Sequence, residues 1–211
     1  MKRFVALSII LTAIIMSIFS YALISKSEDP KVAAFNKSIE HSTLGDNQKA
    51  FSELEKIYEK NKENYLINLR LGWLAFILND FDKSESYYRN AVRISNSSIE
   101  SQLGLTYPLS AKNNWEEIKK IYKNILKVDS ENYFANLGLG QIALSETNYN
   151  EAKKYLEKVF KSYPGEYSVN LSLGWTYYYL GNSAKAKELL TNVLMLSKDD
   201  ASALEGLNLL K

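Results

Sequence analysis

A 34-residue period runs through most of the 211-residue chain. The motif Asn-Leu-x-Leu-Gly-Trp occurs at positions 68–73 and again at 170–175, three 34-residue periods later. In each copy a small residue, Ser84 or Ala186, follows the glycine by twelve positions. Self-similarity at this length is typical of repeat architectures, in which each short unit packs against its neighbours to bury a continuous core.

The second half of each unit has the pattern of a turn followed by an amphipathic helix. An Asp or Asn recurs every 34 residues, and these residue types favour tight turns and cap helix starts. Four residues later comes a small or aliphatic residue, and apolar residues follow four and seven positions after it, on one helical face. The five Asp and Asn positions are Asp46, Asp80, Asn114, Asn148 and Asn182.

The first half of each unit also has helical spacing, as in Leu69, Gly72, Trp73 and Phe76. A glycine inside a helix costs about 1 kcal/mol relative to alanine, so its recurrence indicates a close approach of two helices. We expect the glycine of the first helix to face the small residue of the second. Each unit is then a helix–turn–helix pair.

These residues resemble the tetratricopeptide repeat, a 34-residue unit with a Leu-Gly pair, an aromatic three positions later and a small residue twelve after the glycine. Two units carry the resemblance most clearly: Leu173-Gly174, Tyr177 and Ala186, and Leu139-Gly140, Tyr149, Ala152 and Pro164. The resemblance implies an all-α fold, a right-handed α-solenoid. The domain would span 31–211, with repeats at about 31–64, 65–98, 99–132, 133–166 and 167–200.

Three parts of this domain depart from the pattern. The first repeat has Ser38 at the glycine position, as expected for a terminal unit. In the third, Gly104 falls 32 residues after Gly72, and Pro108 lies inside the first helix, which predicts a bend or a widened turn near 108–114. After the fifth repeat, a helix at 200–211 is expected to cap it through its inner leucines, Leu204, Leu207 and Leu210.

The first 24 residues have the pattern of a signal peptide or a signal anchor. Lys2 and Arg3 precede an apolar run from Phe4 to Ile24, and residues 25–30 form a polar linker. Ser20-Tyr21-Ala22 fits a cleavage site, whereas the uncleaved run is long enough to span a bilayer core of about 30 Å. Both alternatives predict an exported domain, either periplasmic or anchored in the inner membrane of a bacterial envelope.

The composition excludes several kinds of chemistry. There is no cysteine, which removes disulfides, thiolate metal ligands and lipid attachment through cysteine, and the single histidine, His41, cannot form a triad or a metal cluster. Without the first 22 residues, 24 basic residues balance 24 acidic ones, and no basic cluster suggests nucleic acid as a partner. We therefore predict no enzyme activity, no cofactor, no metal site and no membrane contact beyond an uncleaved N-terminal segment.

The resemblance further implies that the first helices line a concave surface for a segment of a partner protein. The residues at the family's groove positions include aromatic and polar side chains: Arg70, Trp73, Phe76, Gln141, Trp175, Tyr178 and Tyr179. An alternative is that Trp73 and Trp175 fill gaps between adjacent units. Other aromatic residues, Tyr88, Tyr122, Tyr149 and Phe160, are expected in the core.

These observations predict a non-enzymatic protein–protein interaction scaffold or adaptor in the cell envelope, with an aromatic groove for an apolar peptide or helix. The alternative is a periplasmic carrier or chaperone for exported substrates, polysaccharide or outer-membrane components, whose aromatic residues stack on sugar rings. Affinity for peptides would favour the scaffold, and affinity for sugars would favour the carrier. The sequence does not identify the partner.

Overall fold

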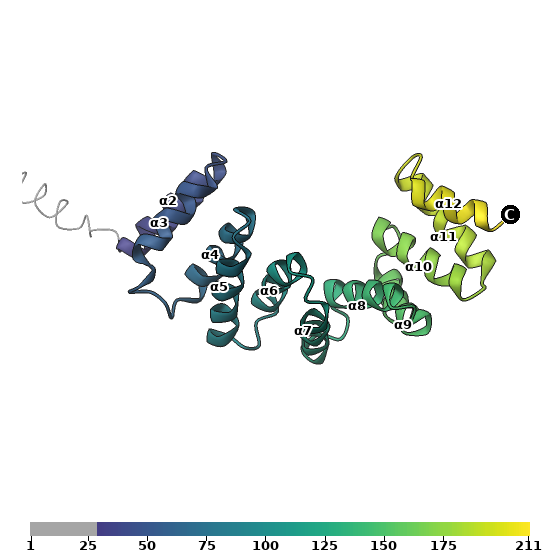
Figure 1. The fold of residues 1–211 in the computed structure, drawn as a ribbon, viewed down its shortest axis with the longest axis horizontal. Helices are drawn as coiled ribbons and strands as arrows, with labels where there is room; N and C mark the ends of the chain where they lie inside the picture. Colours follow the sequence, from purple (N-terminus) through teal and green to yellow (C-terminus); the bar gives the residue numbers. More distant parts are fainter. Residues whose placement is uncertain (1–28) are drawn as a thin grey trace, which may run out of the picture. The chain divides into compact units, whose positions relative to one another are not determined.

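The structure, a computed structural model, describes residues 29–211 (Figure 1). The predicted signal or anchor at 1–24 and most of the linker lie outside this range. The described residues form eleven α-helices and no β-strand. None of these helices is both long and apolar enough to cross a membrane.

The helices fall in two compact units, one ending at Lys62 and one beginning at Glu63. The first unit holds α2 (Pro30–Thr43) and α3 (Asn47–Tyr58), with Ala34 and Ser38 buried on α2 and Phe51 and Leu54 buried on α3. The second unit contains α4 (Tyr65–Ile77), α5 (Phe81–Ile94), α6 (Ile99–Ala111), α7 (Trp115–Val128), α8 (Tyr133–Ser145), α9 (Tyr149–Ser162), α10 (Tyr167–Tyr179), α11 (Ser183–Leu196) and α12 (Ala201–Leu209).

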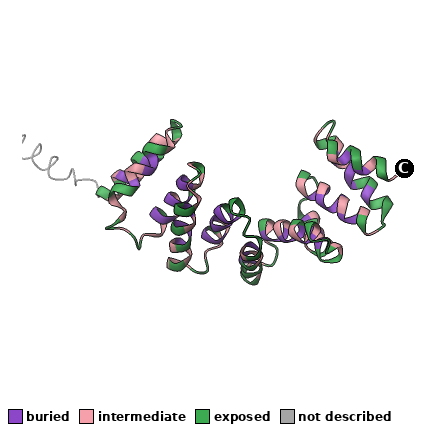
Figure 2. Ribbon diagram, in the orientation of Figure 1, coloured by how far each residue is buried: buried purple, intermediate pink, exposed green. Residues whose placement is uncertain are grey.

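The helices of the second unit keep the 34-residue register. The first helices α4, α6, α8, α10 and α12 begin at 65, 99, 133, 167 and 201, and the second helices α5, α7, α9 and α11 at 81, 115, 149 and 183. Buried residues run along helices such as α4 and α10 (Figure 2). The sequence prediction of an all-helical repeat solenoid is confirmed.

The recurring Asp and Asn residues cap the second helices, as predicted. The side chain of Asp80 accepts a hydrogen bond from the backbone N–H of Lys83 (3.1 Å), and that of Asn182 accepts one from Lys185 (3.2 Å). Asp46 and Asn114 cap α3 and α7 in the same way. Asn148 makes no such side-chain bond to α9.

The third repeat is more regular than the sequence indicated. Helix α6 has 13 residues, like α4, and continues through Pro108 to Ala111. The turn that follows has the same backbone bond as the preceding repeat, since Asn114 N–H donates to Leu109 O just as Asp80 N–H donates to Ala75 O, both at 2.9 Å. The predicted widening of the turn is therefore wrong, because the proline removes one helical donor but leaves the turn bonds intact.

The position of Gly104 has a packing explanation. Tyr88 of α5 is buried, and its ring lies between Gly72 of α4 and Gly104 of α6. A Cβ atom would lie 2.9 Å from the ring Cδ2 if added to Gly72, and 2.7 Å from Cδ1 if added to Gly104. Gly104 is therefore not the repeat glycine moved out of register. It leaves room for the ring of Tyr88 at the contact between one repeat and the next.

The repeat glycine faces a different residue from the one predicted. The ring of Tyr88, rather than the small residue Ser84, occupies the space where a side chain of Gly72 would lie. Ser84 bonds instead to the backbone of the first helix, donating from its hydroxyl to Gly72 O at 2.8 Å. A small residue is needed at position 84 because the two helices approach closely there, but the larger side chain four residues later fills the space beside the glycine.

Buried amide side chains at one position of the first helices bind the preceding loop. Asn170 of α10 donates from Nδ2 to the carbonyl oxygens of Pro164 (2.7 Å) and Glu166 (2.8 Å), and its Oδ1 accepts a bond from Asn192 of α11 (3.1 Å). Asn136 makes the equivalent bonds to the loop before α8. The side-chain bonds supply a donor to Pro164 O and Ser130 O in the loops, whereas Glu166 O and Asn132 O also accept the backbone N–H of Asn170 and Asn136.

Helix α12 occupies the place of a further first helix and packs on α11. Ala203 and Gly206 are buried, and Leu207 and Leu210 pack against the core cluster that contains Ala203. Leu204, predicted on the inner side, is 42% exposed. That part of the prediction is wrong, because the buried stripe follows residues 203, 206, 207 and 210 and Leu204 lies outside it.

Candidate functional site

Three cavities follow one another along the second unit. Their volumes are about 430, 620 and 440 Å³ in chain order. Tyr107 and Ser110 line both the first and the second cavity, and Ser145 lines both the second and the third. The cavities therefore form one continuous surface, which we call the aromatic track: Phe76, Phe81, Tyr107, Ser110, Trp115, Tyr122, Gln141, Ser145, Tyr149, Trp175, Tyr179 and Glu205.

The aromatic track follows the repeat period. The first residue of a second helix contributes an aromatic side chain to each cavity: Phe81 to the first, Trp115 to the second and Tyr149 to the third. These three residues are spaced by 34 positions. Since each cavity repeats the same structural position, the track presents three similar sites in a row.

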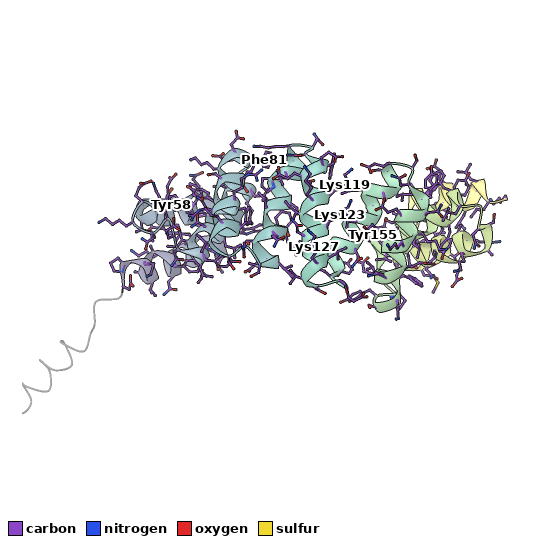
Figure 3. All side chains as sticks on the ribbon, turned by 90° about the horizontal axis from the view of Figure 1, so that it is seen from below. Tyr58, Phe81, Lys119, Lys123, Lys127 and Tyr155 are labelled. Atoms are coloured by element: carbon purple, nitrogen blue, oxygen red, sulfur yellow. The ribbon has the colours of Figure 1, made fainter. Side chains whose placement is uncertain are left out.

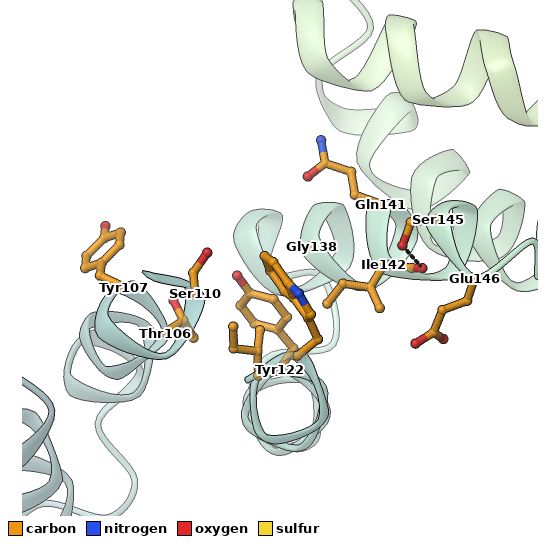
Figure 4. Close-up of a pocket in the computed structure, with 11 residues that line it drawn as sticks. Thr106, Tyr107, Ser110, Tyr122, Gly138, Gln141, Ile142, Ser145 and Glu146 are labelled. Carbon is orange, nitrogen blue, oxygen red and sulfur yellow. Dashed lines mark hydrogen bonds between the residues drawn. The ribbon is translucent and has the colours of Figure 1, made fainter. Parts of the chain in front are cut away.

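The central cavity is the largest of the three and lies between α6 and α8, with α7 between them (Figure 4). Tyr107 and Ser110 of α6 lie on one side, Gln141 of α8 lies on the other, and Tyr122 of α7 lies between them. Burial raises the pKa of Tyr122 above the ordinary tyrosine value, and its hydroxyl is protonated at neutral pH. The cavity thus combines aromatic surface with neutral hydrogen-bonding groups.

An aromatic cluster forms the α4 end of the track. The ring of Phe76 lies 5.4 Å from that of Tyr107 and 5.8 Å from that of Phe81, measured between centroids. Trp73 stands 5.9 Å from Tyr107 and is 42% exposed. These contacts are within the usual range of aromatic pairs, and they leave much of Trp73 and Tyr107 open to solvent.

A second aromatic cluster forms the α12 end. Tyr149 and Tyr179 stack with centroids 4.7 Å apart and planes at 10°, and Trp175 contacts both Tyr178 and Tyr179. The indole N–H of Trp175 donates to the hydroxyl of Ser202 on α12 at 2.9 Å. Trp175 therefore lines the third cavity and also fills the space between neighbouring repeats, which combines the two alternatives drawn from the sequence.

The structure brings most of the sequence-predicted groove residues together. Phe76, Gln141, Trp175 and Tyr179 line cavities of the track, whereas Trp73 and Tyr178 contact residues that line it. Arg70 is half-buried and lines none of these three cavities.

Sequence reasoning missed some residues of the track and assigned two others to the core. Tyr107 and Trp115, each 45% exposed, were not predicted, although the 34-residue spacing of Phe81, Trp115 and Tyr149 was visible in the sequence. Tyr122 and Tyr149 were expected in the core, but both are half-buried, and they line the central and the third cavity. The core prediction is confirmed for Tyr88.

The charged side chains that line the track are acidic, whereas a row of lysines lies along α7. Two carboxylates, Glu146 and Glu205, lie among the cavity-lining residues, and no lysine or arginine does. Lys119 donates to Glu146 at 2.8 Å and heads a stripe along α7 with Lys123 and Lys127 (Figure 3). Basic charge is thus present on α7, but the surface of the track is neutral to acidic.

The described residues offer no visible centre for metal chemistry. No group of three or more His, Asp or Glu side chains in residues 29–211 is placed to hold a metal ion. The track instead offers aromatic faces, hydroxyl groups, the amide of Gln141 and the indole N–H of Trp115, which are groups suited to binding.

The helical register and the inter-repeat packing define a helical-repeat solenoid. Two models of the tetratricopeptide repeat match the chain, at residues 35–99 and 143–208, and together they cover more than half of it. The chain belongs to the tetratricopeptide repeat family. No curated protein sequence matches it at a significant level.

Several solved structures share this fold. The chain is similar to YrrB, a TPR protein with an unusual peptide-binding site, at 18% identity and a TM-score of 0.71, with 90% of this chain and 97% of YrrB covered. A tetratricopeptide repeat protein from Parabacteroides merdae is 17% identical, with a TM-score of 0.75 and coverage of 86% and 72%. MamA from Desulfovibrio magneticus is 15% identical, with a TM-score of 0.71 and coverage of 82% and 98%. At these identities the likeness shows the fold alone.

Proposed function

We propose that this protein is a non-enzymatic scaffold that binds a segment of a partner protein along the aromatic track. TPR proteins serve as protein-interaction scaffolds. The observation that carries the proposal is the continuity of the three cavities, which join through Tyr107, Ser110 and Ser145. A partner segment would bury exposed aromatic surface, and aromatic residues dominate the energetics of many interfaces.

The chemistry of the track supports a protein ligand. Apolar side chains of a partner fit cavities of about 430–620 Å³, and hydroxyl and amide groups such as those of Ser110 and Gln141 can bond to a polypeptide backbone. YrrB, which shares the fold, is described as having a peptide-binding site. By contrast, the rings of Tyr149 and Tyr179 face each other, which leaves less open ring surface for stacking on sugars.

Site-specific crosslinking in the native host tests this proposal. A photoreactive phenylalanine analogue replaces Trp115 in the central cavity, and a matched control replaces Tyr163, which is 50% exposed and lines none of the three cavities. We expect a discrete protein adduct from position 115 and none from position 163. The same adducts from both positions, or none from 115, would contradict the proposal, and copurifying polysaccharide would favour the carrier function.

We further propose that the domain works outside the cytoplasm. The support is the basic pair Lys2 and Arg3 followed by the apolar run from Phe4 to Ile24. Intact mass and fractionation of the protein from its host test the location. A soluble periplasmic form shortened by about the first 22 residues indicates a cleaved signal, a full-length membrane form with a protease-accessible domain outside indicates an anchor, and a cytoplasmic full-length form refutes the proposal.

A further inference from the structure

We propose that Thr106 opens the third repeat to form the central cavity, and that this cavity receives a neutral aromatic side chain, tryptophan or tyrosine, of the partner segment. The inference rests on the proposed function and adds the residue that makes the site and the side chain that fills it. Three features of the second unit carry it: the residue at the repeat glycine position, the packing around α6, and the side chains that fill the equivalent spaces in other repeats.

Thr106 occupies the repeat position that is glycine in the second, fourth and fifth repeats, at Gly72, Gly140 and Gly174. Each of these glycines lies against a side chain of the second helix, and an added Cβ atom would come within 2.9, 2.6 and 3.0 Å of it, respectively. Carbon atoms in favourable contact are about 3.5–4.0 Å apart. Since threonine carries a branched Cβ atom, α7 cannot approach α6 as closely as the second helices approach the first helices in those repeats.

Tyr122 of α7 holds the repeat position of Tyr88 but packs differently. The ring of Tyr88 is buried between two glycines, whereas Thr106 lies beside the hydroxyl of Tyr122, and the ring of Tyr122 lies against Gly138 of α8. The helices α6 and α7 share less contact than the helix pairs of the other repeats, and α6 and α8 share less than α4 with α6 or α8 with α10. The central cavity, about 620 Å³, lies where this contact is reduced (Figure 4).

Side chains of this protein fill the equivalent spaces between the first helices of other adjacent repeats. Trp73 of α4 contacts the ring of Tyr107 on α6, and Trp175 of α10 donates its indole N–H to Ser202 on α12. Gln141 of α8 donates to a hydroxyl on α10 at 3.4 Å. These three residues share one repeat position, so an aromatic side chain is the group that this chain itself places in two of these spaces.

The space between α6 and α8 has no such side chain. Tyr107 holds this position on α6, but its ring contacts those of Trp73 and Phe76, and within the described range it makes no hydrogen bond or ring contact with α8. An aromatic side chain of the partner would take the place that the protein leaves open. Its N–H or O–H group could donate to an acceptor such as the amide oxygen of Gln141.

The charge of the central cavity favours a neutral occupant. Of the described residues that line it, Glu146 is the one with a charge, and Lys119 pairs with it at 2.8 Å. A charged side chain of the partner would lose hydration without gaining a free counter-charge, whereas an indole or phenol ring does not carry this cost. The cavity is therefore complementary to tryptophan or tyrosine rather than to a charged residue.

Binding of N-acetyltryptophanamide to the full-length chain tests the occupant. The NMR signal of the Trp115 indole N–H reports on the central cavity, and Trp115→Phe assigns it among the three tryptophans. We expect this signal to shift on titration, with an affinity about five-fold or more above that for N-acetylleucinamide, because the rings of the cavity favour an aromatic partner. Equal affinities, or a Trp115 signal that does not shift, would overturn the aromatic preference.

Two substitutions test the role of Thr106. Thr106→Gly removes the Cβ atom, so α6 should close on its neighbours and binding of N-acetyltryptophanamide should weaken about ten-fold or more, because a close-packed interface leaves no room for it. Thr106→Ala is the matched control: it keeps the Cβ atom, which is by itself too large for the close contact seen at Gly140, and it should bind as the parent chain does. Any other pattern of the two variants refutes the role of Thr106.

Distances between spin labels show whether Thr106→Gly closes the space or only disturbs folding. The chain has no cysteine, so cysteines introduced in pairs give specific labels. Leu66 on α4, Glu100 on α6 and Phe134 on α8 are exposed and share one repeat position. In Thr106→Gly the distance between positions 100 and 134 should shorten, and that between 66 and 100 should stay the same. An unchanged first distance, or a change in both, overturns the inference.

The outcomes separate this inference from the function on which it rests. A partner that crosslinks to position 115 equally well in Thr106→Gly and in the parent chain supports the scaffold and removes the role of Thr106. Conversely, binding of N-acetyltryptophanamide that follows the expected pattern at position 106, with no protein crosslinked at position 115, refutes the scaffold and leaves the aromatic site standing.

Discussion

Replacing Gly104 with alanine should destabilise the contact between α5 and α6. The added Cβ atom would lie 2.7 Å and 2.8 Å from Cδ1 and Cζ of Tyr88, whereas carbon atoms in favourable contact are about 3.5–4.0 Å apart. The ring cannot retreat easily, because it is 3% exposed and Gly72 lies against its other side.

The expected cost follows from two opposing effects. Overpacking of a buried site costs about 1–3 kcal/mol, and alanine recovers about 1 kcal/mol of helix propensity relative to glycine. Because Tyr88 is enclosed on both sides, the overpacking cost should lie near the upper end of its range. We expect a net loss of about 1–2 kcal/mol, a factor of roughly 5–30 in the local opening equilibrium.

Hydrogen exchange of the α5 and α6 amides, together with urea unfolding, measures this loss. Gly165→Ala is the matched control, because no atom lies within 4 Å of the added Cβ and its backbone is not left-handed. In the double variant with Tyr88→Leu, the cost of Gly104→Ala should fall by about 1 kcal/mol or more, since contacting residues couple by about that amount. A stable Gly104→Ala variant, or an unchanged cost in the double variant, would refute the reasoning.

Three further predictions concern the second unit. Thr147→Gly should stabilise the chain by about 1 kcal/mol in urea unfolding, because this β-branched residue has φ of 62° in the turn before α9. Asn170→Ala should destabilise it by about 1–3 kcal/mol, because two loop carbonyls lose a buried donor; unchanged exchange in the loop before α10 would contradict this. The hydroxyl of Tyr167 donates a hydrogen bond to Asp200, and this bond lowers the pKa of the Asp200 carboxyl. The bond therefore stabilises the docking of α12 at neutral pH. This stabilisation is lost as the pH falls below the ordinary aspartate value of 3.8. In Tyr167→Phe the pKa of Asp200, followed by NMR, should rise, and an unchanged value would show that the bond is unimportant.

Local patterns were sufficient to predict the helices and their caps. The spacing of apolar residues defines which face of a helix is buried, and the Asp or Asn before most second helices supplies a bond that depends only on neighbouring backbone. For that reason the caps at Asp80 and Asn182 were found without tertiary information. Aromatic and polar residues of the first helices were also assigned to a binding surface, and Phe76, Gln141, Trp175 and Tyr179 line the track.

Residues at contacts between repeats were harder to assign. Trp115 and Tyr149 occupy the same repeat position as Phe81, but the sequence did not show that this position faces a cavity. For Trp175 the sequence left two alternative roles open, in the groove or between adjacent units, because its bond to Ser202 depends on how α12 packs. The exposure of such residues depends on the separation of adjacent repeats, which is set by packing across their interface rather than by helical periodicity.

The sequence by itself determined that the chain forms paired helices at a 34-residue period, since spacing, caps and turns act over a few residues. Only the tertiary structure decided that Gly104 holds the ring of Tyr88, that Leu204 lies outside the buried stripe, and that three cavities join into one track. The physical reason is that a side chain on a helix of a solenoid can contact both its own repeat and the next repeat. Which of these contacts it makes depends on the close packing of all the side chains at that interface.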